Sequence, residues 1–161
     1  MQIEYIGTNS LQNIKKIISD IGAKKILLVT GKDSYIESGS EQKISQYLDN
    51  ITVERFYDFE VNPKIEDVYD GVSMALRMKP DLIVAIGGGT VLDMAKLINI
   101  LSSQKDYSFI NIIENSSLIN KQGLSPLVAI PTTSGTGSEA THFAVVYVDK
   151  NKYSLAHKFM L

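Results

Sequence analysis

The chain of 161 residues contains no cysteine, which excludes disulfide bonds and thiolate metal ligands. It also has no long apolar run, since no stretch approaches the roughly 20 apolar residues that a membrane-spanning helix needs. The first five residues, Met1-Gln2-Ile3-Glu4-Tyr5, lack the basic start and apolar run of a secretory signal peptide. We therefore expect a cytoplasmic protein with no membrane partner.

A strong charge of one sign is absent as well, because 16 basic and 18 acidic residues give a net charge of −2. This small, mixed charge is not the basic surface of a nucleic-acid-binding protein, so we expect no nucleic acid as a partner. The hydrophobic content of 44% and the charged content of 21% are typical of globular domains. We expect residues 1–161 to form one domain.

Three short apolar runs, at residues 26–29, 82–86 and 127–130, predict buried strands. Continuous rather than alternating apolar residues are typical of parallel strands that are covered on both faces. A further strand is expected at about residues 52–57. Segments with helical periodicity separate these strands, which predicts an α/β fold with a doubly wound, mostly parallel sheet of the Rossmann-like type.

The expected helices carry apolar residues at intervals of three or four. The first ends at Gly22 and presents one stripe made of Leu11, Ile14, Ile17, Ile18 and Ile21. A weaker helix is expected at residues 41–48. The next follows Asn62-Pro63, which would supply the N-cap and the first helical residue, and the last is expected to begin near Thr90.

The pattern changes after Pro131, where residues 144–148 and 153–157 flank Asp149-Lys150-Asn151-Lys152 and predict a C-terminal β-hairpin. Residues 106–122 are expected to be a long connection. The sequence ends in the apolar Phe159-Met160-Leu161, which leads us to expect a larger parent protein.

Three turns rich in glycine, serine and threonine follow the three apolar runs, at residues 30–32, 87–90 and 131–138. Ligands of open α/β sheets bind beyond the carboxyl ends of the strands. Glycine allows close approach of backbone amides to an anion, and a helix that starts there directs free N–H groups at it. A nucleotide or phosphate ligand is therefore expected at this edge, although Gly87-Gly88-Gly89 alone also fits a purely structural turn.

Two longer motifs carry a family resemblance. The segment Gly87-Gly88-Gly89-Thr90-Val91-Leu92-Asp93-Met94-Ala95-Lys96 resembles the first signature of iron-containing, group III alcohol dehydrogenases, and Pro131-Thr132-Thr133-Ser134-Gly135-Thr136-Gly137-Ser138-Glu139 resembles the second. Asn62-Pro63 and Lys152-Tyr153 match shorter elements of that family. The resemblance spans the chain in order and spacing.

The resemblance implies a binding site for NAD(P)H. Gly87, Gly88, Gly89, Thr90 and Asp93 would lie at the pyrophosphate. Thr132, Thr133 and Ser134 would contact the adenosine side and the phosphates. Asn62 would lie at the ribose or nicotinamide, and Lys152 at the ribose. Each has a plainer alternative: a helix N-cap for Asn62, an i, i+3 pair with Lys96 for Asp93, and a solvated turn residue for Lys152.

One position departs from many relatives, which carry an aspartate directly after the first strand. Here Gly31 stands at that position, followed by Lys32 and Ser34. Loss of a carboxylate and gain of a cation should relax selectivity towards NADP(H). The alternative is a plain turn with a solvated lysine.

The family's metal, expected to be Fe²⁺ or Zn²⁺, is held by one aspartate and three histidines that the resemblance places beyond the end of this sequence. The two histidines present, His142 and His157, show no metal-binding spacing. We thus expect no metal site and no catalytic residue in this chain, which should act only by binding the cofactor. The full-length parent is expected to hold the metal in a helical domain and to form a homo-oligomer.

The function expected of the parent is NAD(P)H-dependent interconversion of small-molecule alcohols and aldehydes. Within the family the sequence looks most like the phosphonoacetaldehyde reductase branch. Two alternatives stay open: a sugar-phosphate cyclase of the dehydroquinate synthase type, and a stand-alone nucleotide-binding domain. The order of residues 131–139 favours the alcohol dehydrogenases over the cyclases.

Overall fold

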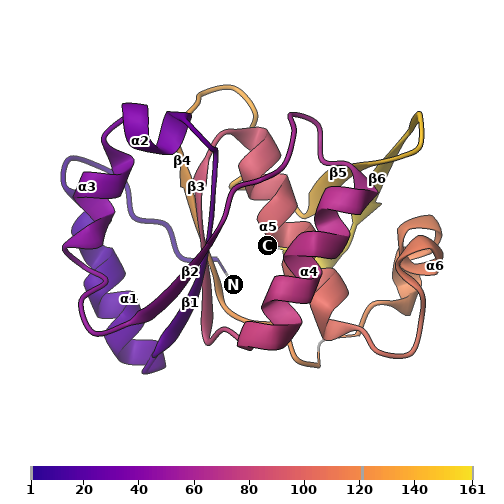
Figure 1. Cartoon of the computed structure of the whole chain (residues 1–161), viewed down its shortest axis with the longest axis horizontal. Coiled ribbons are helices and arrows are strands. Elements are labelled where there is room, and N and C mark those ends of the chain that lie inside the picture. The colour runs from indigo at the N-terminus through magenta and orange to yellow at the C-terminus, as the bar shows by residue number, and fades with distance from the viewer. Residues whose placement is uncertain (1, 121, 161) are drawn as a thin grey trace.

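A computed structural model describes residues 2–120 and 122–160 of the chain. Its centre is a four-stranded sheet in the order β2-β1-β3-β4, in which all neighbours are parallel (Figure 1). The strands are β1 (Lys25–Thr30), β2 (Thr52–Phe56), β3 (Leu82–Gly87) and β4 (Leu127–Pro131). The predicted strands and their parallel pairing are confirmed. In the part of the chain that is described, no helix is both long and apolar enough to cross a membrane.

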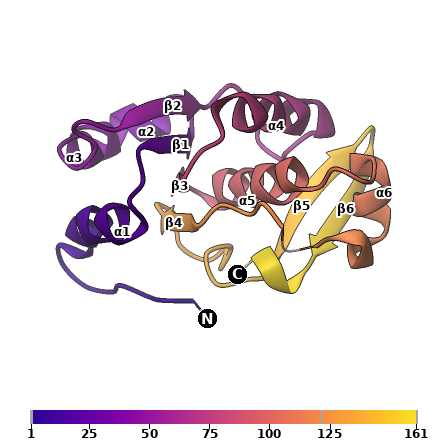
Figure 2. The same cartoon turned by 90° about the horizontal axis from the view of Figure 1, so that it is seen from below.

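Helices cover both faces of this sheet, as Figures 1 and 2 show. One face carries α1 (Asn13–Ile21), α2 (Ser34–Glu37) and α3 (Ser40–Ser45), and the other carries α4 (Ile65–Met78) and α5 (Gly89–Ser103). Successive residues of β1 alternate between the two cores: Ile26 packs with α1 and α3, whereas Leu27 packs with α4 and α5. Burial on both faces explains why the strands are continuously apolar.

The first predicted helix is confirmed with its stop signal. A short 3-10 helix (Ser10–Gln12) precedes α1, whose apolar stripe buries Ile14 and Ile18. The helix ends at Gly22, which adopts the left-handed conformation with φ 69°. The weaker helix predicted at residues 41–48 is α3, shifted towards the N-terminus, and the one-turn helix α2 was not predicted.

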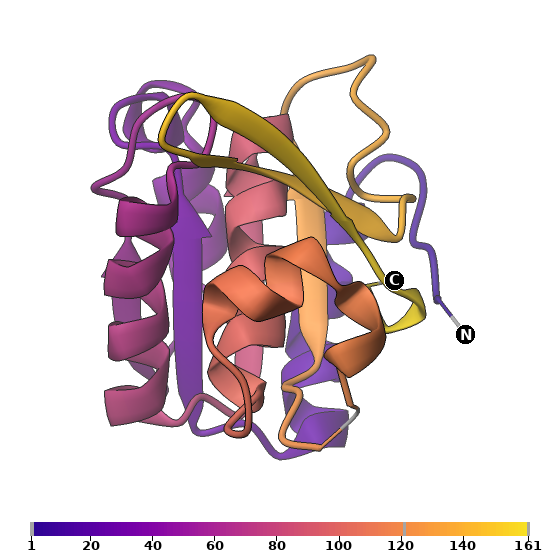
Figure 3. The ribbon, with the colours of Figure 1, turned by 90° about the vertical axis from the view of Figure 1, so that its right-hand side faces the viewer.

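A third layer covers the outer side of α5. It consists of the antiparallel hairpin β5 (Phe143–Val148) and β6 (Asn151–Ala156) with α6 (Phe109–Glu114) (Figure 3). The expectation of a long connection at residues 106–122 is therefore wrong in part. Ser108 caps α6 by accepting a bond from the Asn111 backbone N–H, and 3-10 turns follow at Ser116–Leu118 and Lys158–Met160. Residue 121 lies outside the described residues.

The predicted hairpin is confirmed, but its turn is shorter than expected. Val148 pairs with Asn151, so the turn holds only Asp149 and Lys150. Asp149 takes a positive φ of 53°, the conformation that two-residue hairpin turns require. Lys152 consequently lies within β6, opposite Tyr147, so it is not a turn residue.

The interpretation of Asn62 as an N-cap is wrong. The N-cap of α4 is Lys64, with extended backbone, and Asn62 lies two residues earlier with φ 65°. The carbonyl of Pro63 accepts a 2.7 Å bond from the Tyr147 N–H, and Lys64 forms a parallel bridge with the same residue. Pairing with β5 keeps this segment extended, which a local sequence pattern could not reveal.

Candidate functional site

The three small-residue turns meet at one edge of the sheet, as the sequence predicted. Thr30 pairs with Ile86 at the end of β1, and Gly87 pairs with Pro131 where β3 and β4 end. The Thr132 N–H donates to the Gly87 carbonyl at 2.9 Å, which joins the turns after β3 and β4. Figure 3 shows the segment after β4 arching above this edge, beside the first turn of α5.

The N-terminus of α5 is well suited to an anion. Gly88 is its N-cap, with φ −79° and ψ −174°, and no side chain caps the helix. The N–H groups of Gly89 and Thr90 donate no hydrogen bond to any other described residue. No acidic residue lies in the first turn, so the partial positive charge of the helix end is not neutralised locally.

The glycines also have a packing role. A Cβ atom on Gly88 would lie 3.0 Å from Thr133 Oγ1, and one on Gly89 would lie 3.1 Å from Thr136 Cγ2. One on Gly87 would lie 2.5 Å from the Val91 side chain. The absence of side chains lets the threonine-rich turn lie directly against the start of α5. The structural and the anion-binding interpretations of the glycines are therefore compatible.

The turn after β4 presents hydroxyl groups next to those free amides. Thr132, Thr133 and Ser134 are exposed, whereas Ser138 is buried against Gly89. Hydroxyls accept or donate hydrogen bonds according to need. The edge thus offers neutral donors of two kinds, side-chain hydroxyls and backbone amides.

Asp93, one turn further along α5, is only 7% exposed. Its Oδ2 accepts a 3.1 Å bond from the Val145 N–H, but its buried Oδ1 has no partner among the described residues. Burial raises the pKa of the Asp93 carboxyl above its usual value, against the lowering effects of the Val145 bond, of Lys96 and of the nearby Ser138 hydroxyl. Such an orphaned acceptor suits a hydroxyl donor supplied by a ligand.

The alternative of a simple Asp93–Lys96 pair does not describe the structure. The Lys96 ammonium donates to the carbonyls of Thr141 and Phe143, at 2.5 and 3.1 Å, and forms no ion pair with Asp93. Burial lowers the pKa of Lys96. Lys96 thus links α5 to the start of β5 by hydrogen bonds.

Glu139 is a half-buried carboxylate to which the sequence patterns gave no role. Its Oε2 is buried without a partner among the described residues, and its charge raises the pKa of Lys96. Its place at the end of the second signature was the signal available. Two carboxylates near the carboxyl edge thus each carry an unsatisfied oxygen.

Asn62 and Lys152 are brought to the same region through Tyr147. The backbone of Tyr147 bonds to Pro63 on one side, and its cross-strand partner is Lys152. The charge of Lys152 also lowers the pKa of Asp93, although less than the other neighbours of this carboxylate do. Both side chains are exposed.

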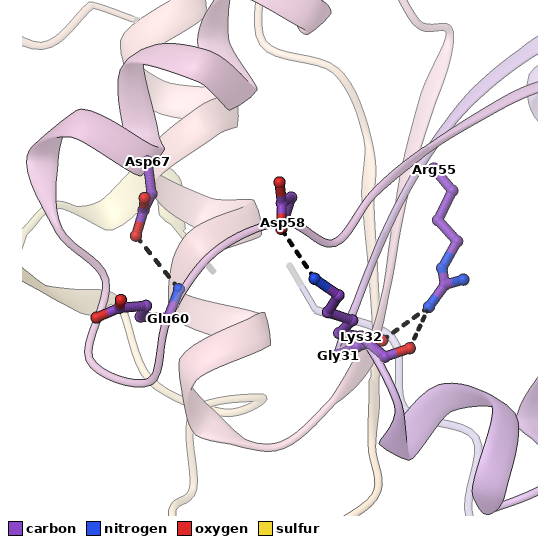
Figure 4. Close-up of polar contacts among 6 residues, drawn as sticks. All are labelled: Gly31, Lys32, Arg55, Asp58, Glu60 and Asp67. Carbon is purple, nitrogen blue, oxygen red and sulfur yellow. Dashed lines mark hydrogen bonds and ion pairs between the residues drawn. The ribbon is translucent and has the colours of Figure 1, made fainter.

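The turn after β1 is held by a residue that the sequence analysis missed (Figure 4). Arg55 donates through Nε to Thr30 Oγ1 at 2.8 Å, and through Nη2 to the carbonyls of Gly31 and Lys32 at 2.9 and 2.8 Å. The Lys32 ammonium lies 3.3 Å from an exposed Asp58 carboxylate oxygen. Ser34 Oγ lies 2.3 Å from the Cβ position of Gly31.

Residues 2–120 and 122–160 hold no group of three or more His, Cys, Asp or Glu side chains that could bind a metal ion. His142 and His157 lie at the open end of the hairpin, where the His157 N–H donates to the His142 carbonyl at 2.9 Å. Burial lowers the pKa of the His157 imidazole. That the metal of the family is held elsewhere stays a prediction.

A doubly wound parallel sheet with a glycine-initiated helix at its carboxyl edge is the architecture of Rossmann-like domains. The model of the family "Iron-containing alcohol dehydrogenase" matches residues 3–161. The chain therefore belongs to the iron-containing alcohol dehydrogenase family.

Individual relatives agree with this assignment. The chain is 33% identical over 156 residues to an NADPH-dependent butanol dehydrogenase of Clostridium saccharobutylicum, which covers 94% of this chain and 39% of that protein. An iron-containing alcohol dehydrogenase of Thermotoga maritima superposes with a TM-score of 0.80 at 33% identity, over 91% of this chain and 40% of that one. A sulfoacetaldehyde reductase of Bifidobacterium kashiwanohense, solved with NAD⁺, gives a TM-score of 0.86 at 25% identity, over 100% and 44%. The chain spans about two fifths of the length of these relatives.

Proposed function

We propose that this chain is the dinucleotide-binding part of an NAD(P)H-dependent alcohol dehydrogenase or aldehyde reductase. The observation that carries the proposal is the uncapped N-terminus of α5, which lies against the exposed hydroxyls after β4. Its free amides face an open edge where a pyrophosphate would find donors and a favourable helix dipole. The family match favours this function over a sugar-phosphate cyclase.

The residues present fit a dinucleotide along this edge. In the proposed assignment Gly87, Gly88, Gly89 and Thr90 bind the pyrophosphate, and Thr132, Thr133 and Ser134 bind the phosphates and the adenosine side. Gly31, Lys32 and Ser34 lie at the adenosine ribose. The unpartnered Asp93 Oδ1 accepts a hydrogen bond from a hydroxyl group of the cofactor, and Asn62 and Lys152 lie at the nicotinamide end.

In the whole protein, bound NAD(P)H would supply the hydride, and a Fe²⁺ or Zn²⁺ ion would supply Lewis-acid polarisation of the substrate oxygen. This chain contributes binding and orientation. The metal ligands, a cytoplasmic location and a homo-oligomeric state are proposed for the whole protein on the family resemblance. A small-molecule alcohol or aldehyde is the proposed substrate.

A second, narrower candidate is a two-carbon aldehyde that carries an anionic group. The likeness to the phosphonoacetaldehyde reductase branch favours it, and so does the structural likeness to a sulfoacetaldehyde reductase. Steady-state kinetics of the whole enzyme with phosphonoacetaldehyde, sulfoacetaldehyde and butanal test it. Equal kcat/KM for all three aldehydes argues against an anion-selective substrate site.

The proposed cofactor site is tested by titration of the chain with NADH and NADPH. Gly88→Val places a branched side chain against Thr133, 3.0 Å from its hydroxyl at Cβ alone, and blocks access to the α5 amides. We expect its dinucleotide affinity to fall by about tenfold or more. Ser73→Val, on the exposed face of α4, is the matched control and should bind like the wild type. Unchanged binding by a folded Gly88→Val variant would show that the site is assigned wrongly.

A further inference from the structure

Arg55 makes an unusual set of contacts for a residue on an edge strand. It lies opposite Leu28 in the β1–β2 pair, and its side chain reaches past the end of β1. There it makes three hydrogen bonds, all to the turn of residues 30–32 and at 2.8 to 2.9 Å. Figure 4 shows the guanidinium approaching the carbonyls of Gly31 and Lys32 from one side.

These contacts determine where the amides of the turn point. No peptide bond in the described chain is cis, and in a planar trans peptide the C=O and the next N–H point in opposite directions. Because the carbonyls of Gly31 and Lys32 face Arg55, the N–H groups of Lys32 and Asp33 face away from it. Neither N–H donates a hydrogen bond within residues 2–120 and 122–160. Arg55 therefore presents two free donors on the opposite side of the turn.

Arg55 also leaves a fixed positive charge behind this turn. Its guanidinium lies 4.6 Å from the centre of the Tyr35 ring and 4.4 Å from that of Tyr57, which holds it in place by cation–π contact. Its hydrogen-bond partners are neutral, and it forms no ion pair with any carboxylate of the described residues. The charge is thus not cancelled locally.

Lys32 is a weaker source of charge than the sequence suggested. Its side chain is 63% exposed and its ammonium is paired with Asp58, itself 85% exposed. Exposed pairs of this kind contribute little and are screened by salt. The fixed cation of the turn is Arg55.

We propose that Arg55 is a positioning residue that makes the β1–α2 turn prefer an adenosine with a 2′-phosphate over one with a free 2′-hydroxyl. It acts through the backbone of Gly31 and Lys32, and its charge favours the doubly negative phosphate. The inference rests on the proposed function, because it takes this turn as the place where the adenosine ribose lies.

The test compares adenosine 2′,5′-bisphosphate with 5′-AMP, two probes that lack the nicotinamide half. Their dissociation constants are measured by calorimetry on the 161-residue chain at one ionic strength. The wild type should bind the bisphosphate more tightly. Arg55→Met keeps the unbranched stem between the two tyrosines but removes the charge and the donors. The ratio of the dissociation constant of 5′-AMP to that of the bisphosphate should then fall by about tenfold. Almost all of this change should come from weaker binding of the bisphosphate.

Three further variants separate positioning from general damage. Arg55→Lys keeps the positive charge but loses the planar guanidinium with its several N–H donors. Its ratio should lie between those of Arg55→Met and the wild type. Arg77→Met removes an exposed arginine that pairs with Glu54 and should leave the ratio unchanged. If Arg55→Met does not fold, Tyr57→Leu is the substitute, because it removes one of the two cation–π contacts of the guanidinium. Tyr57 is 38% exposed, so the chain should tolerate this change, and the ratio should again fall.

The possible results distinguish the two proposals. An unchanged ratio in a folded Arg55→Met, or an equal loss for both probes, overturns the role of Arg55 and leaves the nucleotide site intact. If the wild type binds neither probe nor either dinucleotide, the proposed function falls and this inference with it.

Discussion

At the scale of single residues, Asp93 is the most deeply buried carboxylate of the site. It is 7% exposed and has one carboxylate oxygen without a partner in the described structure. A buried polar atom without a hydrogen bond costs about 1–3 kcal/mol, and the charge adds to this cost. The raised pKa of Asp93 has the same origin, since burial disfavours the ionised form. The chain tolerates an unfavourable residue where the cofactor is proposed to supply the missing donor.

Asp93→Asn should therefore stabilise the chain while weakening binding. Because the folded state raises this pKa, the folded form gains stability below the unfolded pKa and loses it as pH rises through the folded pKa. Asparagine is uncharged and does not carry the cost of burying an ionised carboxylate at pH 7. The free energy of unfolding of the variant at this pH should therefore rise by about 1 kcal/mol. The gain should vanish near pH 3, where both side chains are neutral. Urea unfolding at both pH values measures it, and dinucleotide titration should show reduced affinity.

The control for this prediction is Asp20→Asn, in a pair with Lys16 whose side chains are 59% and 67% exposed. It should leave the free energy of unfolding nearly unchanged, because exposed ion pairs contribute little to stability. A less stable Asp93→Asn variant at pH 7 would mean that attraction to Lys96 and Lys152 outweighs burial.

At the scale of elements, α5 positions most of the site. Twelve of its fifteen residues are buried, because the sheet, α4 and the hairpin enclose it on different sides. It packs against α4 at Gly71, where a Cβ atom would lie 2.4 Å from Ile98 Cδ1 and 2.9 Å from the Phe56 ring. The glycine lets α4 approach the central helix.

Gly71→Ala should destabilise the chain although alanine is the better helix former. Helix propensity favours alanine by about 1 kcal/mol, but overpacking at a crossing costs about 1–3 kcal/mol, and the contact includes the Phe56 ring as well as the flexible end of Ile98. We expect a net loss of about 1 kcal/mol in urea unfolding. Ser73→Ala on the exposed face of the same helix should not be destabilising, and Ile98→Val should recover part of the loss in a Gly71→Ala background. Equal stabilisation by both alanine variants would show that α4 can shift without cost.

The sequence predicted elements better than contacts between distant elements. The strands and α1, α4 and α5 follow from local apolar patterns, and the common edge of the three turns follows from parallel pairing. The prediction that Asn62 is the N-cap of α4 failed because Pro63 and Lys64 pair with Tyr147, more than 80 residues away in the sequence. Arg55 was missed because a single arginine in a strand has no motif, and its contacts depend on the twist and register of β1 and β2.

At the scale of the whole molecule, the polar groups of the carboxyl edge suit the proposed nucleotide better than they suit a metal ion. The edge offers amides, hydroxyls and two carboxylates whose neighbours include Lys96 and Lys152. Metals of this kind need three or four nitrogen or oxygen ligands converging on one point. The two histidines meet only through their backbones at the open end of the hairpin.

This arrangement predicts that the 161-residue chain holds no stoichiometric, tightly bound Fe²⁺ or Zn²⁺. Two imidazoles without a third converging ligand give weak binding that a chelator removes, whereas a complete site retains its ion. Elemental analysis after anaerobic loading and gel filtration measures the retained ion, and dinucleotide titration of the same sample checks that the chain is folded and competent. His142→Ala and His157→Ala should leave the metal content unchanged. One tightly held ion per chain, lost in either variant, would contradict this expectation and give the hairpin a metal site of its own.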